Sequence, residues 1–371
     1  MAASVAACGP SAVTSPSPSA AGLIATPPPA SVSVAPDPLT DLVAAARGEG
    51  TLTTIGLSPG WCNYRATIDA FKKRYGLEVQ ELSPDATPGE QLDALKADPA
   101  SGKAPDVVDV TMAVAGQAKA AKLVAPYKVA TWSTIPDVLK DKDGAWTGDY
   151  YGVLVFEVNT SVISTAPTAW ADLTNPSARG LLSLAGDPRV NSQAGLAVLS
   201  AGLANGGSLD DVKPGLTWLK GLAASNRLSQ SVATSDTIDR GLTPLAMRWT
   251  YNALWHRDGT AGNPPIEVVA PSTGRIGVAN AQVINARAPH PNAARLWLEF
   301  LYSDAGQNLW LDGYCHPARF ADLASREAIP VETLARLPDT SGVVFPTVAQ
   351  QAKAFQTIAD TWDTTVGLEI R

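Results

Sequence analysis

Strand-like and helix-like patterns of hydrophobic residues alternate along this chain from residue 39 onwards. An apolar run at 51–55 predicts a buried strand, and Tyr64, Ile68 and Phe71 recur at the spacing of one helix face within 63–75. Other expected strands lie at 77–82, 106–110, 181–184, 244–248, 266–269 and 281–284, and other expected helices at 39–47, 89–97, 192–204, 214–225, 292–301 and 304–313. This alternation predicts a mostly parallel sheet with helices on both faces, the α/β class.

The first 38 residues carry no such pattern. Residues 9–38 are dominated by Ala, Ser, Pro, Thr and Val, lack the volume to form a core, and are expected to be a disordered tether. Cys8 follows the small residues Val5, Ala6 and Ala7, as at a bacterial lipoprotein cleavage site. Only seven residues precede Cys8, too few for a complete signal peptide, so a chance cysteine is the alternative. With a lipidated Cys8, the body would be extracytoplasmic, anchored to the outer face of the cytoplasmic membrane.

Composition excludes several classes of function. A chain of 371 residues with 45% hydrophobic residues can build two compact units, each with a core. The formal net charge of -7, with acids and bases interleaved, argues against binding to nucleic acid. No segment approaches the about 18 uninterrupted apolar residues of a membrane-spanning helix. The chain also lacks the phosphate-binding loop of nucleotide hydrolases, so we expect no ATP hydrolysis.

The cysteines and histidines indicate no metal site. Cys62 and Cys315 are far apart in the sequence, and in an oxidising compartment they could form a disulfide or stay as two buried thiols. The three histidines, His256, His290 and His316, show no zinc-like spacing with cysteine. We therefore expect no metal and no cofactor.

Short motifs in a shared order resemble the family 1 extracellular solute-binding proteins of ABC importers, which include ferric-iron, polyamine and aminoethylphosphonate binders. The matching segments are 68–71, 75–79, 104–108, 123–127, 155–160, 167–173, 186–189 and 288–294. The resemblance covers most of residues 40–330. It implies a two-lobed periplasmic-binding-protein-like fold of type 2, a hinge of crossing strands and a ligand cleft between the lobes.

On that template, the domain boundaries follow from the two expected crossings, near 150–158 and 269–284. Residues 39–152 and 283–371 would form the first lobe, and 153–282 the second. The resemblance also implies a monomer whose partners are a small-molecule ligand and the ABC permease subunits in the membrane. Such a protein binds its ligand by closure of the lobes and is not an enzyme.

The turn after the first strand offers a candidate binding loop, because open α/β sheets bind ligands beyond the carboxyl ends of their strands. Ser58 and Asn63 could hydrogen-bond a ligand, and Trp61 offers an aromatic face, unless it simply packs the lobe. The segment 56–60 also matches the nucleophile elbow of α/β-hydrolases, so a secreted esterase using Ser58 is the rival hypothesis. Pro59 argues against it, because the oxyanion hole needs an N–H that proline lacks.

Later turns supply the other candidates. The ligand-binding residues expected there, and on the crossings, are Asp187, Arg189, Asn191, Ser192, Arg248, Trp249, Tyr251, Thr111, Tyr151 and Asn280. A helix start near Ser192 favours an anion, although Asn191 could simply cap that helix. Of the pair at the first crossing, Tyr151 is taken to line the cleft, and filling the hinge is an equal alternative.

These candidates favour a small anionic or zwitterionic organic solute, which could contain an amine. Arg248 and the helix start near Ser192 suit a carboxylate or phosphonate. Ferric-iron members of the resembled family use a tyrosine pair where only Tyr251 stands here, and polyamine members place carboxylates on the second crossing, where 277–282 has none. Iron and polyamines therefore remain alternatives within the family.

Overall fold

A computed structural model describes residues 39–175 and 182–371, and residues 39–371 form one compact unit. The expected tether at 1–38, the lipid site at Cys8 and the first residue of the strand expected at 181–184 lie outside the described residues.

The described strands closely follow the sequence pattern. They are β1 (Thr51–Ile55), β2 (Glu78–Glu81), β3 (Val107–Thr111), β4 (Val124–Ala125), β5 (Thr147–Asn159), β6 (Leu182–Ser183), β7 (Leu245–Trp249), β8 (Ile266–Val269), β9 (Gly277–Asn285) and β10 (His316–Pro317). Apolar runs bounded by Gly and Pro mark most of them, which is why β1 and β8 begin and end where expected. The short strands β4 and β10 carry too few residues to show a pattern.

The described helices also match their amphipathic segments. They are α1 (Thr40–Glu49), α2 (Tyr64–Tyr75), α3 (Pro88–Ala94), α4 (Met112–Ala120), α5 (Ser192–Ala204), α6 (Lys213–Ala224), α7 (Ser235–Asp239), α8 (Thr250–Gly259), α9 (Pro291–Leu301), α10 (Asp304–Asp312), α11 (Phe320–Ser325), α12 (Val331–Leu334) and α13 (Val348–Thr365). Four short 3₁₀ turns also occur, at Pro99–Ser101, Trp132–Thr134, Asp137–Leu139 and Trp170–Thr174. The expected helices correspond to α1, α2, α3, α5, α6, α9 and α10, whereas α4, α7, α8, α11, α12 and α13 were not predicted.

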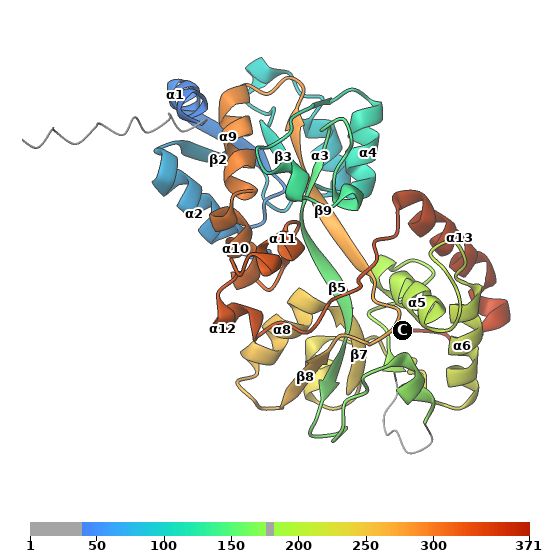
Figure 1. Ribbon diagram of the computed structural model, residues 1–371. Coiled ribbons are helices and arrows are strands. Elements are labelled where there is room, and N and C mark those ends of the chain that lie inside the picture. The colour runs from blue at the N-terminus through green and yellow to red at the C-terminus, as the bar shows by residue number, and fades with distance from the viewer. Residues whose placement is uncertain (1–38, 176–181) are drawn as a thin grey trace, which may run out of the picture. The chain divides into compact units, whose positions relative to one another are not determined.

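One strand, β5, belongs to both halves of the sheet. The strand order is β2-β1-β3-β9-β5-β7-β6, with β4, β8 and β10 paired at the side of this path. Thr147–Val153 of β5 pairs with β9, whereas Leu154–Val158 pairs with β7. Figure 1 shows β5 and β9 running together between the upper and lower parts of the fold. The mixed α/β fold is confirmed, and these two strands cross between its lobes.

The expectation of a mostly parallel sheet is wrong in one respect. β1 is parallel to β2 and β3, and β6 is parallel to β7, as βα units require. The crossing strands β5 and β9, however, run antiparallel to each other and to β3 and β7. The sheet is therefore mixed, because each crossing strand enters a lobe from the opposite end to the strands already there.

The first lobe has a hydrophobic core on each face of its sheet. Val107 of β3 packs with α2 and α9 residues such as Phe71 and Trp297, whereas its neighbour Val108 packs with α3 and α4 residues such as Leu95. Successive strand residues point to opposite faces, so this alternation fills both cores. The helices thus hold the carboxyl ends of β1 and β3 in fixed positions.

The second lobe contains α13, which corrects the expected domain boundary. Ala354, Ile358 and Trp362 of this helix belong to the same core as Phe156 of β5 and Leu199 of α5. Figure 1 shows α13 beside α5 and α6, with the C-terminus close to this lobe. The assignment of all of 283–371 to the first lobe is therefore wrong for 348–371, because this amphipathic helix covers the second core.

Removing the indole of Trp362 should strongly destabilise the protein, because this side chain is fully buried in the second core. We expect Trp362→Ala to lower the free energy of unfolding by about 3–5 kcal/mol, measured by urea denaturation. Trp255 provides a matched control, since it is 71% exposed, and Trp255→Ala should change the free energy by less than about 0.5 kcal/mol. Equal effects of the two substitutions would contradict this packing of α13.

Candidate ligand-binding site

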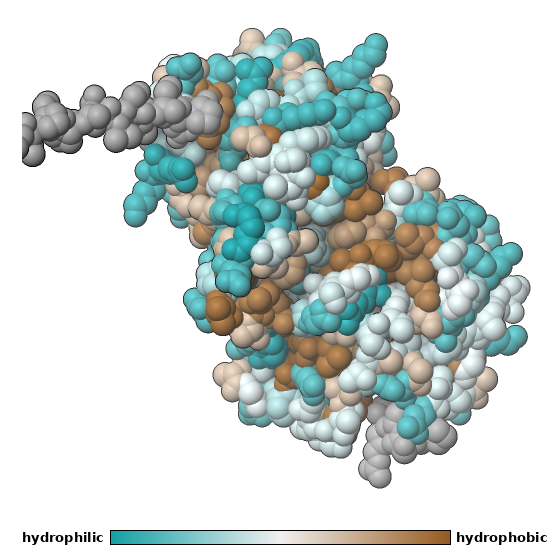
Figure 2. Space-filling view, viewed as in Figure 1, coloured by the Kyte–Doolittle hydropathy of each residue, from teal (hydrophilic) through white to brown (hydrophobic). Residues whose placement is uncertain are grey.

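A cavity of about 390 Å³ lies where the two lobes meet. It is bounded by the ends of β3 and β7, by the crossing strands β5 and β9, and by α5, α8 and α13. The residues that line it are Trp61, Thr111, Met112, Ala113, Tyr150, Gly152, Ser192, Leu196, Trp249, Tyr251, Val278, Asn280, Val348, Gln351, Ala352 and Phe355. Figure 2 shows hydrophobic surface gathered at the junction of the lobes. Residues from both lobes therefore face a common space.

Six of the residues expected from the sequence line this cavity. They are Trp61, Thr111, Ser192, Trp249, Tyr251 and Asn280. They come from five separate segments of the chain, and the fold brings them together because each lies at or after the end of a strand or on a crossing. That these six contact a ligand stays a prediction.

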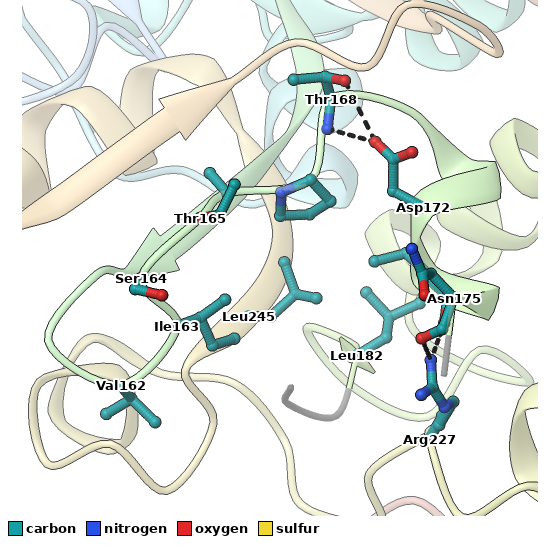
Figure 3. A pocket seen from close by; sticks show the side chains of 13 residues that line it. Val162, Ile163, Ser164, Thr165, Thr168, Asp172, Asn175, Leu182, Arg227 and Leu245 are labelled. Atoms are coloured by element: carbon teal, nitrogen blue, oxygen red, sulfur yellow. Dashed lines mark hydrogen bonds between the residues drawn. The ribbon is translucent and has the colours of Figure 1, made fainter. Parts of the chain in front are cut away.

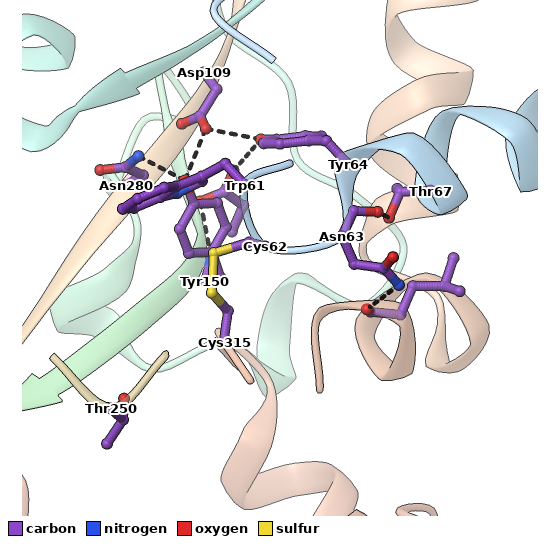
Figure 4. The surroundings of a disulfide bond; sticks show 12 residues. Trp61, Cys62, Asn63, Tyr64, Thr67, Asp109, Tyr150, Thr250, Asn280 and Cys315 are labelled. Carbon is purple, nitrogen blue, oxygen red and sulfur yellow. Dashed lines mark hydrogen bonds between the residues drawn. A yellow bond between two sulfur atoms is a disulfide. The ribbon is translucent and has the colours of Figure 1, made fainter. Parts of the chain in front are cut away.

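A hydrogen-bond network holds Trp61 at the wall of the cavity. The indole Nε1 of Trp61 donates to the hydroxyl of Tyr150 over 2.6 Å, and the side-chain amide of Asn280 donates to the same oxygen over 2.7 Å. The Tyr150 hydroxyl in turn donates to Asp109 over 3.0 Å. Figure 4 shows these side chains converging from the loop after β1, from β3 and from the crossing strands. Tyr150 therefore fixes Trp61 and joins both crossings.

Two buried carboxylates lie behind Tyr150. The hydroxyl of Tyr64 lies 2.9 Å from Asp109 and 3.1 Å from Asp149, and the amide of Gln282 donates to both Tyr64 and Asp149. Burial raises the pKa of Asp149 to about 6, and burial together with the charge of Asp149 raises the pKa of Asp109 well above its usual range. Protonation of this pair is therefore linked to folding.

A disulfide anchors the same loop. Cys62 and Cys315 are bonded, with their Cα atoms 5.5 Å apart, which confirms the pairing that the sequence left open. The bond joins the residue after Trp61 to the segment that follows α10 (Figure 4). Backbone at Cys62 and Asn63 is left-handed, and a Cβ on Gly313 would lie 2.6 Å from Cys62. The close approach of these two segments therefore requires glycine at 313.

Two residues of that loop do not reach the cavity, contrary to expectation. The amide of Asn63 donates to the carbonyl of Leu309 and so holds α2 against α10. Ser58 does not line the cavity, and its carbonyl accepts the N–H of Trp61 within the turn. None of the histidines serves Ser58 as a base, because His256 pairs with Glu157, His290 pairs with Asp106, and His316 stacks on Tyr151.

The candidate residues before α5 have structural roles, whereas Ser192, the first residue of α5, lines the cavity. Asp187 accepts a hydrogen bond from the Arg189 guanidinium, and this bond lowers the pKa of Asp187. The same guanidinium also pairs with Asp363 of α13 over 2.7 Å. Asn191 caps α5 by accepting the N–H of Ala194. These contacts tie the turn to its own lobe, and Asp187, Arg189 and Asn191 are not among the residues that line the interlobe cavity.

Arg248 and Tyr151 were also expected in the cleft and face elsewhere. The guanidinium of Arg248 lies 3.2 Å from the buried carboxylate of Glu157, which also pairs with His256. Tyr151 is buried and stacks on His316, whose pKa burial lowers to about 4. Adjacent strand residues point to opposite faces, so the cavity receives Trp249 instead of Arg248 and Tyr150 instead of Tyr151.

Helix α13, which was not predicted from the sequence, forms part of the cavity wall. Val348, Gln351, Ala352 and Phe355 line the cavity from this helix. The signal was present, because Thr347 and Gln350 form a capping box at the start of an amphipathic segment. Met112 and Ala113, at the start of α4, follow Thr111 into the cavity and were likewise missed.

A larger cavity of about 630 Å³ lies within the second lobe alone. Ile163, Leu182 and Leu245 line it, and the Arg227 guanidinium at its edge donates to the backbone carbonyls of Leu173 and Asn175 (Figure 3). Among the residues that the structure describes, none from the first lobe lines it. A ligand there would not bridge the lobes, so the interlobe cavity is the better candidate.

Comparison with known proteins identifies the family. Residues 102–339 match the family of bacterial extracellular solute-binding proteins. The chain belongs to this family. It is therefore a solute-binding protein of an ABC transport system and not an enzyme, and the specific substrate is not determined by the match. No curated protein sequence matches the chain.

Solved structures share the fold of this solute-binding protein. A Bordetella parapertussis structure described as an extracellular solute-binding protein matches with a TM-score of 0.71 and 16% identity, over 86% of this chain and 99% of the other. Ferric ion-binding protein A of Pasteurella haemolytica gives 0.62 and 16%, over 86% and 98%. The spermidine/putrescine-binding protein PotD of Streptococcus pneumoniae gives 0.63 and 14%, over 85% and 99%. Identities this low establish the fold alone.

None of the helices within 39–175 and 182–371 is long and apolar enough to cross a membrane. In the same ranges, no group of three or more His, Cys, Asp or Glu side chains is arranged to hold a metal ion.

Loss of the disulfide should weaken the fold around Trp61. A Cys62→Ala, Cys315→Ala double variant is expected to lose about 2–4 kcal/mol of unfolding free energy, because the bond closes a long loop in the unfolded chain. Urea denaturation measures this. A reducing agent should destabilise the wild type to a similar degree and leave the double variant unchanged; an insensitive wild type would contradict a bond that supports the fold.

The carboxylate pair should give stability a distinct pH dependence. The raised pKa of Asp149 means that the native state takes up a proton more readily than the unfolded state, so the free energy of unfolding rises as pH falls through about 6. Between pH 7 and pH 5, we expect the wild type to gain roughly 1 kcal/mol more than Asp149→Asn, by urea denaturation at each pH. Asp187, with its lowered pKa, stays ionised in this window. An equal gain in both proteins would refute the linkage.

Proposed function

We propose that this chain is the substrate-binding lipoprotein of an ABC importer, which captures a small polar organic solute between its lobes and delivers it to membrane permease subunits. The observation that carries this proposal is the interlobe cavity, whose lining comes from both lobes and from the two strands that join them. A solute in that position contacts Trp61 and Asn280 on one side and Trp249 and Ser192 on the other. Its binding therefore depends on how close the lobes are.

The mechanism that follows is binding by closure. The lobes are connected by β5, by β9 and by the segment around Val344, which bridges to Ile276. Small rotations in these few connections are enough to move one lobe against the other. A solute that contacts both lobes binds the closed form more tightly and so shifts the equilibrium towards it. The permease would recognise the closed form.

The expected placement of the protein is part of the proposal. We infer a lipid anchor at Cys8, a tether at residues 9–38, and a monomeric body on the outer face of the cytoplasmic membrane. The small-residue pattern before Cys8 and the extracellular family support this placement. Such a tether lets the body move between solute capture and a permease in the same membrane.

The sequence favoured an anionic solute, and the structure removes the main reason for that preference. The expectation of an anionic group depended mainly on Arg248, which is paired with Glu157 instead. Ferric iron is not favoured. The cavity lining offers two phenol groups, those of Tyr150 and Tyr251, but no carboxylate. A polyamine is not favoured either, since its ammonium groups would find no carboxylate in that lining.

A thermal-shift screen of the full chain tests the proposal. Polyamines, aminophosphonates, amino acids, quaternary amines, thiamine and ferric complexes should be compared, because a ligand bound only by the native state raises the Tm. We expect one class to raise the Tm by several degrees and to lose this effect in Trp61→Ala and Trp249→Ala, but not in the exposed-site control Trp255→Ala. No shift with any compound, together with ester hydrolysis that depends on Ser58, would replace this proposal with the esterase.

A further inference from the structure

The interlobe cavity combines many aromatic side chains with a complete absence of charged ones. Five of its lining residues are aromatic, and none of the lining residues that the structure describes is Asp, Glu, Lys, Arg or His. A buried ammonium group that carries several N–H donors would find no carboxylate side chain in this lining, which is costly. The lining instead suits a charge that is spread over carbon and needs no hydrogen bond.

Three of the aromatic rings form a corner. The ring centroids of Trp61 and Tyr251 are 4.9 Å apart at an interplanar angle of 65°, and those of Trp249 and Tyr251 are 6.4 Å apart at 24°. Gly152 of β5 allows this arrangement, because a Cβ there would lie 2.4 Å from the Tyr251 ring. The two tryptophans come from different lobes. Ring faces of different orientation therefore meet at the junction of the lobes.

The polar groups beside these rings, the Tyr150 hydroxyl and the Trp61 N–H, already have hydrogen-bond partners within the protein. The Tyr150 hydroxyl accepts from Trp61 and Asn280 and donates to Asp109, so it has no further proton to give. The N–H of Trp61 is likewise engaged. Since its indole donates towards a carboxylate through Tyr150, hydrogen-bond polarisation makes the Trp61 ring richer in electrons. What Trp61 offers to a ligand is its ring.

The carboxylates behind Tyr150 have no cation beside them. Asp109 is 3% exposed and Asp149 is fully buried, and neither takes part in an ion pair with any described residue. Their described partners are the neutral side chains of Tyr64, Tyr150 and Gln282. One oxygen of Asp109 has no hydrogen-bond partner among the described residues. Any negative charge on this pair would be stabilised by a positive charge in the neighbouring cavity.

We propose that the cavity binds an alkylated ammonium group, a nitrogen cation covered by methyl or methylene carbons, on the rings of Trp61, Trp249 and Tyr251. This inference rests on the proposed solute-binding function and names the chemical class of its solute. Such a cation is attracted by ring faces and has no N–H groups to satisfy, which matches the uncharged aromatic lining.

The ammonium group could belong to a simple cation or to a zwitterion that also carries a carboxylate. Thr111 and Ser192, at the starts of α4 and α5, line the cavity together with the rings. Their hydroxyls could accommodate a carboxylate some distance from the ammonium group. Both kinds of solute share the group that the rings recognise, and the binding experiment separates them.

Calorimetric titration of the full chain with matched probes tests the proposal. The probes are choline, glycine betaine, ethanolamine and the neutral isostere of choline in which carbon replaces nitrogen. We expect choline or glycine betaine to bind at least about tenfold more tightly than the neutral isostere and ethanolamine. Tighter binding of glycine betaine would identify a zwitterion, and tighter binding of choline a cation.

Matched variants connect that preference to the rings. Trp61→Leu and Tyr251→Leu should each weaken binding of the preferred probe by about tenfold or more, whereas Trp61→Phe, which keeps a ring face, should weaken it less. Trp255→Leu is the control, because Trp255 is exposed and does not line the cavity. Circular dichroism and the Tm of each variant show whether it is folded.

The other outcomes separate this inference from the proposed function. Equal binding of choline and its neutral isostere would mean an apolar cavity without cation recognition and would overturn the inference. Binding of another class from the thermal-shift screen, with none of the ammonium probes, would also overturn it and leave the solute-binding function intact. Binding of no solute at all would count against both.

Discussion

The hydroxyl of Tyr150 is the point on which the geometry of the cleft depends. It accepts hydrogen bonds from the loop after β1 and from β9, and it donates to Asp109 of β3. Tyr150 itself lies on β5, so four segments that are far apart in the sequence meet at one oxygen atom. The binding loop, the first-lobe sheet and both crossings are thereby held in register, and Trp61 has a defined position before any solute arrives.

The disulfide and the network act on the same loop from different sides. Cys62 is bonded to Cys315, while Trp61, one residue earlier, is held by Tyr150. A loop with two such restraints loses little conformational entropy when it binds a ligand, so more of the contact energy appears as affinity. The second-lobe rings lie on regular elements, Trp249 at the end of β7 and Tyr251 in α8. Gly152, which has no side chain, leaves room for the Tyr251 ring. Each lobe therefore presents its rings on rigid elements.

Much of the fold could be predicted from local pattern, whereas the site could be predicted only in part. Helix α5 begins and ends where its apolar spacing indicated, because local periodicity is enough to define a helix. Whether Arg248 or Trp249 enters the cleft could not be predicted in this way. Neighbouring strand residues face opposite sides of a sheet, and the sequence does not say which side is the cleft. Tyr150 and Tyr151 present the same ambiguity. The role of α13 depends on a contact between distant segments, which no local pattern contains.

The position of α13 in the second lobe has a consequence for the order of folding. The second core is started by β5 and α5 but is completed by Ala354, Ile358 and Trp362, and all of the first lobe's remaining sequence lies between. A chain that emerges from its N-terminal side cannot close this core until that intervening sequence has also emerged. Until then the apolar surface of α5 and α6 stays open to water and to other chains. The second lobe, whose core needs residues up to Trp362, is therefore the last of the two to be completed as the chain is made.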